Sequence, residues 1–306
     1  MEKYPESQRP FEQLDREEQS LALLYRESAT WGIGHGCAAG WDAEPGQLPQ
    51  MIYADVMLAV QIPSMTPDIR NDSGQLIQLS MRALATLSED GVGQAWQSLS
   101  DLATEYASWL QRARNDVNHL PAHLQPVATR HLDACDVCLT RIHTGITLLR
   151  NDHRVRKAFR LANLAMLLQQ IATKQLSHRP LRWNPALKLV RPEGEHRSPW
   201  HIYEQYQEGA GAGLWRAFQI AFLLMSLEGV TNGHSPDREI VDLIWFPTGG
   251  GKTEAYLGVM ALYMFHERLL MVDGETLRRD GTNVLMRYTL RMLTTCLLYT
   301  SPSPRD

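Results

Sequence analysis

The sequence has few cysteines and no apolar run long enough to cross a membrane. Four cysteines in 306 residues exclude a small disulfide-bonded scaffold and favour a reducing compartment. The longest apolar stretches, such as "IAFLLMSL", are far shorter than the about 20 residues that a membrane-spanning helix needs. The N-terminus, "MEKYPESQRPFEQLDREEQ", has no apolar signal-peptide core. We therefore expect a cytoplasmic protein without membrane contact.

Basic residues are not in excess either, since the formal net charge is −4. This balance excludes a protein that binds nucleic acid through its overall charge, so any such contact must come from a local surface. A hydrophobic content of 44% with 21% charged residues is typical of a globular protein with a substantial core.

Patterns along the chain divide it into five parts. Apolar residues recur at three- and four-residue steps between Trp96 and Leu110 and again after Ala158, which predicts a bundle of helices. Strand and helix patterns then alternate, which predicts an α/β domain with a parallel sheet. The expected parts are a mixed segment at 1–74, a helical region at 75–177, an irregular linker at 178–213, an α/β domain at 214–295 and a tail at 296–306.

The stretch "DLIWFPTGGGKTEAYLG", residues 242–258, indicates a phosphate-binding loop between a strand and a helix. Gly249, Gly250 and Gly251 allow a tight bend that turns backbone N–H groups towards an anion. Lys252 adds a positive charge for the β- and γ-phosphates of ATP, and the Thr253 hydroxyl is expected to ligate Mg2+. A helix from about Lys252 to Val272 directs its N-terminal dipole at the phosphates. The alternative is a glycine-rich turn with a solvated lysine.

One position departs from the general phosphate-loop pattern. That pattern has glycine six residues before the lysine, and this chain has Phe246 there. The loop instead resembles the first motif of superfamily-2 helicases and translocases, with matching residues at Pro247, Thr248, Gly249, Gly251, Lys252 and Thr253. The resemblance implies a RecA-like domain, here only its beginning, preceded by a mostly helical accessory region.

An upstream glutamine in "LWRAFQIAF" fits the same resemblance. Superfamily-2 proteins often carry a glutamine beside an aromatic residue ahead of the loop, where its amide reads the hydrogen-bonding edge of adenine. The resemblance implies that role for Gln219, with Phe218 or Trp215 stacking on the base. The alternative is an ordinary amphipathic helix with Gln219 at the edge of its buried face.

The segment "NVLMRYTLRMLTT" resembles the next helicase motif, in which a strand leads into a helix that contacts the nucleic-acid backbone. Thr289 matches the threonine of that motif, whereas Tyr288 stands where the family has proline. Arg287 and Arg291 can contact phosphates, a contact that positions nucleic acid without reading its sequence. Arginines on a solvated helix face are the alternative.

The last residues, "CLLYTSPSPRD", resemble a translated sequencing adapter, so residues 296–306 are interpreted as non-native. We then expect the acidic box that positions Mg2+ and water, and the arginine fingers of a second RecA-like domain, to lie downstream. On this interpretation the chain is an N-terminal fragment that binds nucleotide at most and does not hydrolyse it.

Several segments together resemble the large helicase family of DISARM anti-phage defence systems (DrmA-like). They are "IWFPTGGGKTEAYLG", "VLMRYTLRMLT", "GHGCAAGW", "SMTPDI" and "AFRLANLAM". The resemblance implies a bacterial ATPase that acts on DNA beside a methyltransferase and other defence-system subunits; the residues themselves leave RNA open. A nucleotide-sensing interaction module without translocation is the alternative function.

A pair of cysteines in the helical region forms a C-x-x-C motif. Cys135 and Cys138 have His131 and His143 nearby. A zinc site needs four ligands at suitable spacing, and no second C-x-x-C occurs. We favour cysteines packed on a helix face and keep zinc as the alternative.

Overall fold

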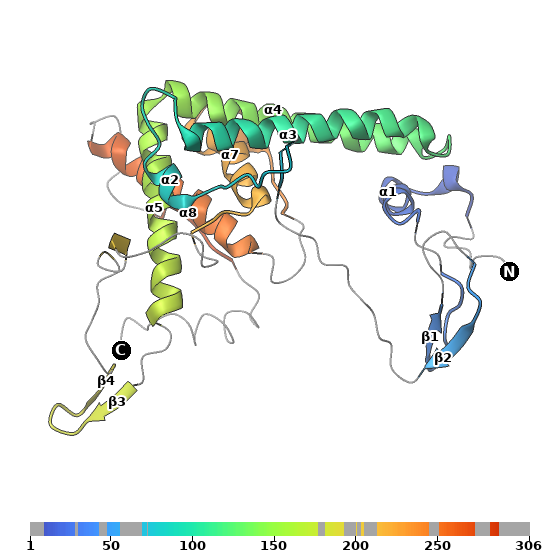
Figure 1. The fold of residues 1–306 in the computed structure, drawn as a ribbon, viewed down its shortest axis with the longest axis horizontal. Coiled ribbons are helices and arrows are strands. Elements are labelled where there is room, and N and C mark those ends of the chain that lie inside the picture. The colour runs from blue at the N-terminus through green and yellow to red at the C-terminus, as the bar shows by residue number, and fades with distance from the viewer. Residues whose placement is uncertain are drawn as a thin grey trace. The chain divides into compact units, whose positions relative to one another are not determined.

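Helices dominate the computed structural model, which describes residues 9–27, 30–42, 48–55, 69–71, 73–176, 181–192, 200, 203–204, 213–244, 251–272 and 282–287 (Figure 1). The α-helices are α1 (Arg16–Leu24), α2 (Met81–Ala85), α3 (Gln94–Asp116), α4 (Gln125–Asn151), α5 (His153–Leu176), α7 (Ala217–Thr231) and α8 (Lys252–Val272). The 3-10 helices are η1 (Phe11–Gln13), η2 (Val117–His119) and η3 (Pro236–Glu239). The strands are β1 (Ala38–Trp41), β2 (Ile52–Asp55), β3 (Leu181–Asn184) and β4 (Leu189–Pro192).

The strands form two antiparallel hairpins, β1–β2 and β3–β4. No parallel strand pair occurs in the described residues, so the parallel sheet expected for 214–295 is not part of the fold seen here. The content of both helices and strands is compatible with an α/β protein. None of the described helices combines the length and apolarity of a membrane span.

The chain divides into two units, and each unit draws on separate stretches of sequence. One unit, called unit 1, comprises Met1–Gln78, Trp96–Ile146 and Arg216–Met225. The other, called unit 2, comprises Leu79–Ala95, Thr147–Trp215 and Ser226–Asp306. Neither unit corresponds to one continuous part of the sequence.

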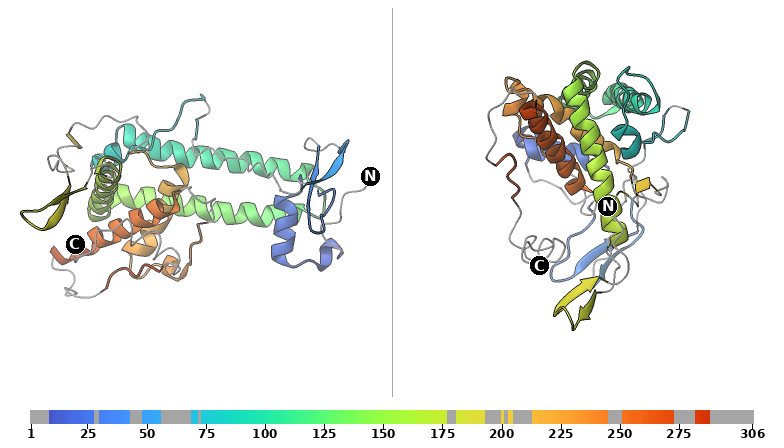
Figure 2. Two further views of the ribbon diagram at one scale, coloured as in Figure 1. Left: turned by 90° about the horizontal axis from the view of Figure 1, so that it is seen from below. Right: turned by 90° about the vertical axis from the view of Figure 1, so that its left-hand side faces the viewer.

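In unit 1, α3 and α4 lie alongside each other as a helical hairpin (Figures 1 and 2). The apolar stripe of α3 is buried, as its spacing predicts, at Trp96, Leu99, Leu102, Ala103 and Leu110. Near the end of α3, the Arg114 guanidinium donates to Asp133 at 2.8 Å and also to Asp136, both on α4. Because these groups are partly exposed, the ion pairs contribute little stability and mainly reflect the helix register.

The N-terminal helix α1 joins the same unit through a small apolar cluster. Its first turn carries a capping box in which Asp15 accepts from the Glu18 N–H at 2.9 Å and Glu18 accepts from the Asp15 N–H at 3.0 Å. Leu23 is buried against the start of α4, where the cluster consists of Leu124, Val127 and Ala128. Burial of these side chains therefore fixes α1, rather than helix propensity alone.

α4 and α7 approach so closely in unit 1 that only glycine fits at one position. A Cβ added to Gly145 on α4 would lie 2.2 Å from the Leu224 carbonyl oxygen and 3.1 Å from its Cα on α7. Both contacts are with backbone, which cannot rotate away as a side chain can. Gly145 therefore allows the two helix backbones to touch.

In unit 2, α5 packs against both α2 and α8. Its apolar face is buried at Val155, Ala158, Phe159, Ala162, Met166, Leu167 and Ile171. Asn163 is also buried there. Its Oδ1 accepts from the Trp215 Nε1–H at 2.7 Å, and its Nδ2 donates to the Phe159 carbonyl at 2.8 Å. The amide thus satisfies the indole N–H inside the apolar core.

Replacing Asn163 by leucine is expected to lower the free energy of unfolding by about 2 kcal/mol, because the buried Trp215 N–H loses its acceptor. In a double-mutant cycle, Trp215→Phe should be less harmful in the Asn163→Leu background than alone, since phenylalanine has no N–H to satisfy. Urea unfolding of the four proteins measures both effects. Additive losses would show that the hydrogen bond contributes nothing.

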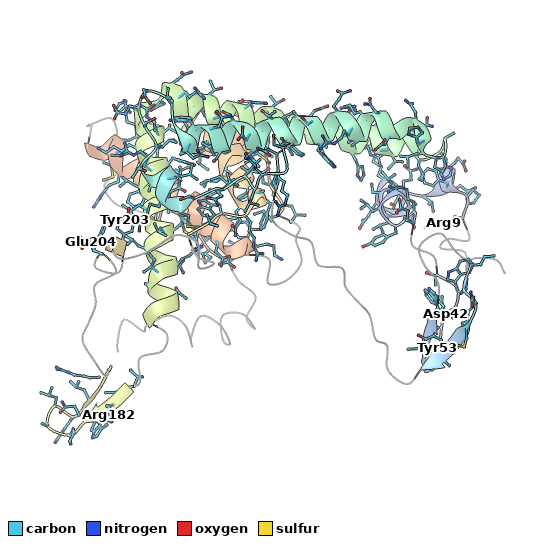
Figure 3. The ribbon with its side chains drawn as sticks, viewed as in Figure 1. Arg9, Asp42, Tyr53, Arg182, Tyr203 and Glu204 are labelled. Atoms are coloured by element: carbon cyan, nitrogen blue, oxygen red, sulfur yellow. The ribbon has the colours of Figure 1, made fainter. Side chains whose placement is uncertain are left out.

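The hairpins β1–β2 and β3–β4 have well-defined registers. In β1–β2, Gly40 lies opposite Tyr53, which is labelled in Figure 3. In β3–β4, Arg182 lies opposite Arg191 and Trp183 lies opposite Val190. The Asn184 side chain closes this second hairpin by accepting two backbone N–H groups of the turn, each at 3.0 Å.

Candidate nucleotide-binding site

The helix predicted after the glycines is present with the expected bounds. α8 runs from Lys252 to Val272. Gly251, the residue before it, has φ +86°, a left-handed conformation that glycine adopts without steric cost. Gly251 therefore has a conformation typical of a turn, directly before the helix, where a phosphate loop has its last glycine. The first N–H groups of α8 have no partners within the helix and can bind an anion.

α8 is held by its packing against α5 in unit 2 (Figure 2). Ala255, Leu262 and His266 recur on one face and are buried. Thr253 and Tyr256 lie outside this face and are exposed, while Lys252 and Glu254 are half-buried. The contact with α5 thus orients the helix and leaves the Thr253 hydroxyl accessible.

The expected loop residues Phe246, Pro247, Thr248, Gly249 and Gly250 lie outside the described residues. The strand expected before them is described only at 241–244, where it has no regular structure. Val241 is 93% exposed and Leu243 is 84% exposed. A strand of a parallel sheet is stable only between neighbouring strands, and residues 241–244 have none among those described.

Gln219 lies in the first turn of α7, where it is buried. Its Oε1 accepts from the Arg216 N–H at 2.8 Å, which is half of a capping box. Phe218 is half-buried beside it. Trp215, the other residue considered for stacking on adenine, is buried and donates to Asn163. Gln219 belongs to unit 1 and Lys252 to unit 2, so adenine recognition by Gln219 stays a prediction.

Of the residues expected to contact nucleic acid, the structure describes Arg287 only. Arg287 is exposed at the end of the irregular segment 282–287, and Thr289 and Arg291 lie outside the described residues. In the same segment Leu285 is exposed despite its apolar side chain. Phosphate contact by these residues stays a prediction.

His266 on α8 has an unusual environment that the sequence did not reveal. Its side chain is buried, and Nδ1 has no hydrogen-bond partner among the residues that the structure describes. Burial lowers the pKa of His266 below 6.5, while the negative charges of Glu267 and Asp152 oppose this shift and Arg154 adds to it. The imidazole is therefore neutral at neutral pH.

We expect the chain to lose stability as the pH falls below about 6.5, because the unfolded chain then protonates His266 while the folded chain keeps it neutral. The stability associated with neutral His266 is fully present above about pH 6.5. It is lost progressively as the pH falls towards the pKa of His266 in the folded chain. The variant His266→Gln, which is neutral at every pH, should flatten this part of the dependence. Urea unfolding of both proteins at about pH 8 and about pH 5.5 measures it. An equal loss in both proteins would contradict the prediction.

Cys135 and Cys138 lie on α4 and are half-buried. Cys135 is hydrogen-bonded to the Tyr106 hydroxyl of α3; burial, and then this bond, raise the pKa of Tyr106. In the part of the chain that the structure describes, no three His, Cys, Asp or Glu side chains gather closely enough to hold a metal. The contact of Cys135 with Tyr106 joins α4 to α3.

Sequence patterns did not single out Asn163 as a buried hydrogen-bonding partner or His266 as a buried base. A polar residue within the apolar face of a helix is the signal that both positions carry. That signal identifies a buried polar group but not its partner, because the partner comes from elsewhere in the chain.

Comparison with known proteins gives one informative similarity. No protein-family model matches the chain. The chain is 34% identical over 281 residues to DISARM protein DrmA from Bacillus paralicheniformis. The aligned part covers 89% of this chain and 23% of that protein, so the chain spans about a quarter of the length of its relative. This chain is therefore similar, along nearly all of its own length, to a part of DISARM protein DrmA.

Proposed function

We propose that this chain binds ATP and Mg2+ at the N-terminus of α8, as part of an ATP-dependent superfamily-2 DNA helicase or translocase of a DISARM-type phage-defence system. The observation that carries the proposal is the junction at Gly251 and Lys252. In the sequence "PTGGGKT", a helix begins at the lysine, directly after a glycine with φ +86°.

Each residue of the loop has a distinct part in this proposal. We assign phosphate binding to the backbone N–H groups of Gly249, Gly250 and Gly251, together with the positive end of the α8 dipole. The Lys252 ammonium donates to the β- and γ-phosphates, and the Thr253 hydroxyl ligates Mg2+. The exposure of Thr253 and the fixed orientation of α8 on α5 support these roles.

For the 306 residues themselves we propose nucleotide binding without hydrolysis. Hydrolysis also needs an acidic residue that positions Mg2+ and water, and an arginine that stabilises the transferred phosphoryl group. We assign these groups, and translocation on DNA with other defence subunits, to a longer protein that contains this chain. Its similarity to a DISARM protein several times longer supports this assignment.

Titration of the chain into a fluorescently labelled ATP analogue tests the proposal. Saturable binding in Mg2+ that weakens in EDTA is expected, because Mg2+ would supply positive charge to the phosphates and Thr253 would help to hold it. Absence of binding in both buffers would contradict nucleotide binding. Sequencing the source DNA past codon 295 tests the helicase assignment separately, since a DExH-type box and a second RecA-like half are expected there. An open reading frame that ends at residue 306 would favour a nucleotide-sensing module.

A further inference from the structure

The β3–β4 hairpin carries two arginines, Arg182 and Arg191, on one face and Trp183 and Val190 on the other. Residues 181–192, "LRWNPALKLVRP", contain Arg182, Lys188 and Arg191 and no carboxylate, in a chain with net charge −4. All three cationic side chains are exposed. The hairpin is thus a local basic element in a protein that is acidic overall, the arrangement expected of a surface that meets a polyanion.

The register places two like charges directly opposite each other. Arg182 lies directly opposite Arg191 in the register of the hairpin, and directly opposite residues place their side chains on the same face. Directly opposite residues have Cβ atoms about 4.5–5.5 Å apart, and like charges at this distance oppose strand pairing. Two arginines at neighbouring positions on one face can bind the same phosphate or adjacent phosphates, because arginine binds phosphate through paired N–H groups.

The turn of the hairpin adds a third cation at a conformational cost. Lys188 has φ +50°, the single left-handed non-glycine residue among those described. A residue with a Cβ is disfavoured there by roughly 1–2 kcal/mol relative to the right-handed region, and glycine or asparagine would fit more easily. A strained residue at an exposed tip is a reason to look for function, and here it carries positive charge.

The opposite face of the hairpin is an exposed apolar platform. Trp183 is 60% exposed and lies opposite Val190, with Leu181 next along the same face. An indole exposed on a thin ribbon can stack on any nucleobase, since every base has a π-face. The two faces therefore suit two parts of one ligand: phosphates on the arginine face and an unstacked base on the tryptophan face.

We propose that the β3–β4 hairpin binds nucleic acid at a junction between single and double strands, with Arg182, Lys188 and Arg191 on the phosphates and Trp183 on the exposed base. The inference rests on the nucleic-acid substrate of the proposed function, but not on ATP binding. Arginines and tryptophan on opposite faces of one ribbon favour a junction over a plain duplex, which presents phosphates and no free base.

Fluorescence anisotropy of the chain with labelled forked, single-stranded and fully paired oligonucleotides tests the proposal. The variant Arg182→Ala/Arg191→Ala should bind all three about 10-fold more weakly. Its slope of log affinity against log salt should fall by roughly 0.7 to 0.9 for each lost phosphate contact. The matched control Arg112→Ala/Lys157→Ala, which removes two exposed cations from α3 and α5, should bind as the unchanged chain does.

The variant Trp183→Ala should bind the forked oligonucleotide about 10-fold more weakly and the paired one equally well, because only the fork offers a base for stacking. If the unchanged chain binds no oligonucleotide at low salt, both the nucleic-acid substrate of the proposed function and the role of the hairpin are rejected. If the unchanged chain and the arginine variant bind the oligonucleotides equally well, the chain binds nucleic acid elsewhere and only the role of the hairpin is rejected. A lower melting temperature of Trp183→Ala with intact DNA binding would show that the apolar face packs on protein, and would also overturn the inference.

Discussion

Alanine in place of Lys252 is expected to weaken ATP binding by the chain about 10- to 100-fold, the range for losing a hydrogen bond between charged groups. Lys252 is the first residue of α8, where the first N–H groups have no acceptor within the helix itself. The ammonium group is the one cation that the loop motif itself supplies to the β- and γ-phosphates. In a longer protein that contains this chain, the same change should abolish ATP hydrolysis, because the γ-phosphate loses its electrostatic stabilisation.

The measurement is a titration with a labelled ATP analogue in Mg2+, supported by hydrolysis assays on the longer protein. Lys157→Ala on α5 is a suitable control, since it removes an exposed lysine of the same unit. Circular dichroism checks that α8 still forms, and alanine favours helix as strongly as lysine does or more. If the Lys252→Ala variant binds the ATP analogue as tightly as the unchanged chain does, Lys252 does not bind the phosphates, despite the similarity of the loop to that of helicases.

A second large effect is expected at Gly145, where alanine should lower the free energy of unfolding by about 3 kcal/mol, near the upper limit for overpacking. The added Cβ would lie 2.2 Å from the Leu224 carbonyl oxygen, well inside van der Waals contact. Relief requires α4 and α7 to move apart, which also opens the apolar contacts around them. Helix propensity alone would make the alanine variant more stable by about 1 kcal/mol. A loss of stability would therefore indicate the clash with Leu224.

Gly233→Ala provides the matched control, because a Cβ added at Gly233 meets no atom within 4 Å. We expect its effect to stay within about 0.5 kcal/mol, as for most surface substitutions. Urea unfolding followed by circular dichroism compares both variants with the unchanged chain. Equal stability of the two variants would mean that α4 and α7 are not in backbone contact.

Local sequence patterns predicted the helices because each helix satisfies its own backbone hydrogen bonds. The apolar spacing from Trp96 to Leu110 predicted the buried face of α3, and that burial is confirmed. The start of α8 at Lys252 is confirmed as well. In both cases the signal lies within a few turns of the residues concerned, where periodicity and glycine content are decisive.

Features that join distant parts of the chain were not predictable in this way. The partner of Trp215 is Asn163, and no local pattern connects the two positions. The strand expected before the phosphate loop depends on neighbouring strands for every backbone hydrogen bond, so an apolar run alone does not determine it. Gln219 illustrates a third limit: one glutamine side chain can cap a helix or read a base, and its sequence context fits both.

The interleaving of the two units has a consequence for how the chain can be divided. Unit 1 receives sequence from before Gln78, from the middle of the helical region and from the start of α7, while unit 2 takes the stretches between them. A single proteolytic cut or stop codon therefore separates neither unit from the other. Recombination between related genes would need several junctions to exchange one unit intact, so we expect the two to be inherited and to vary together.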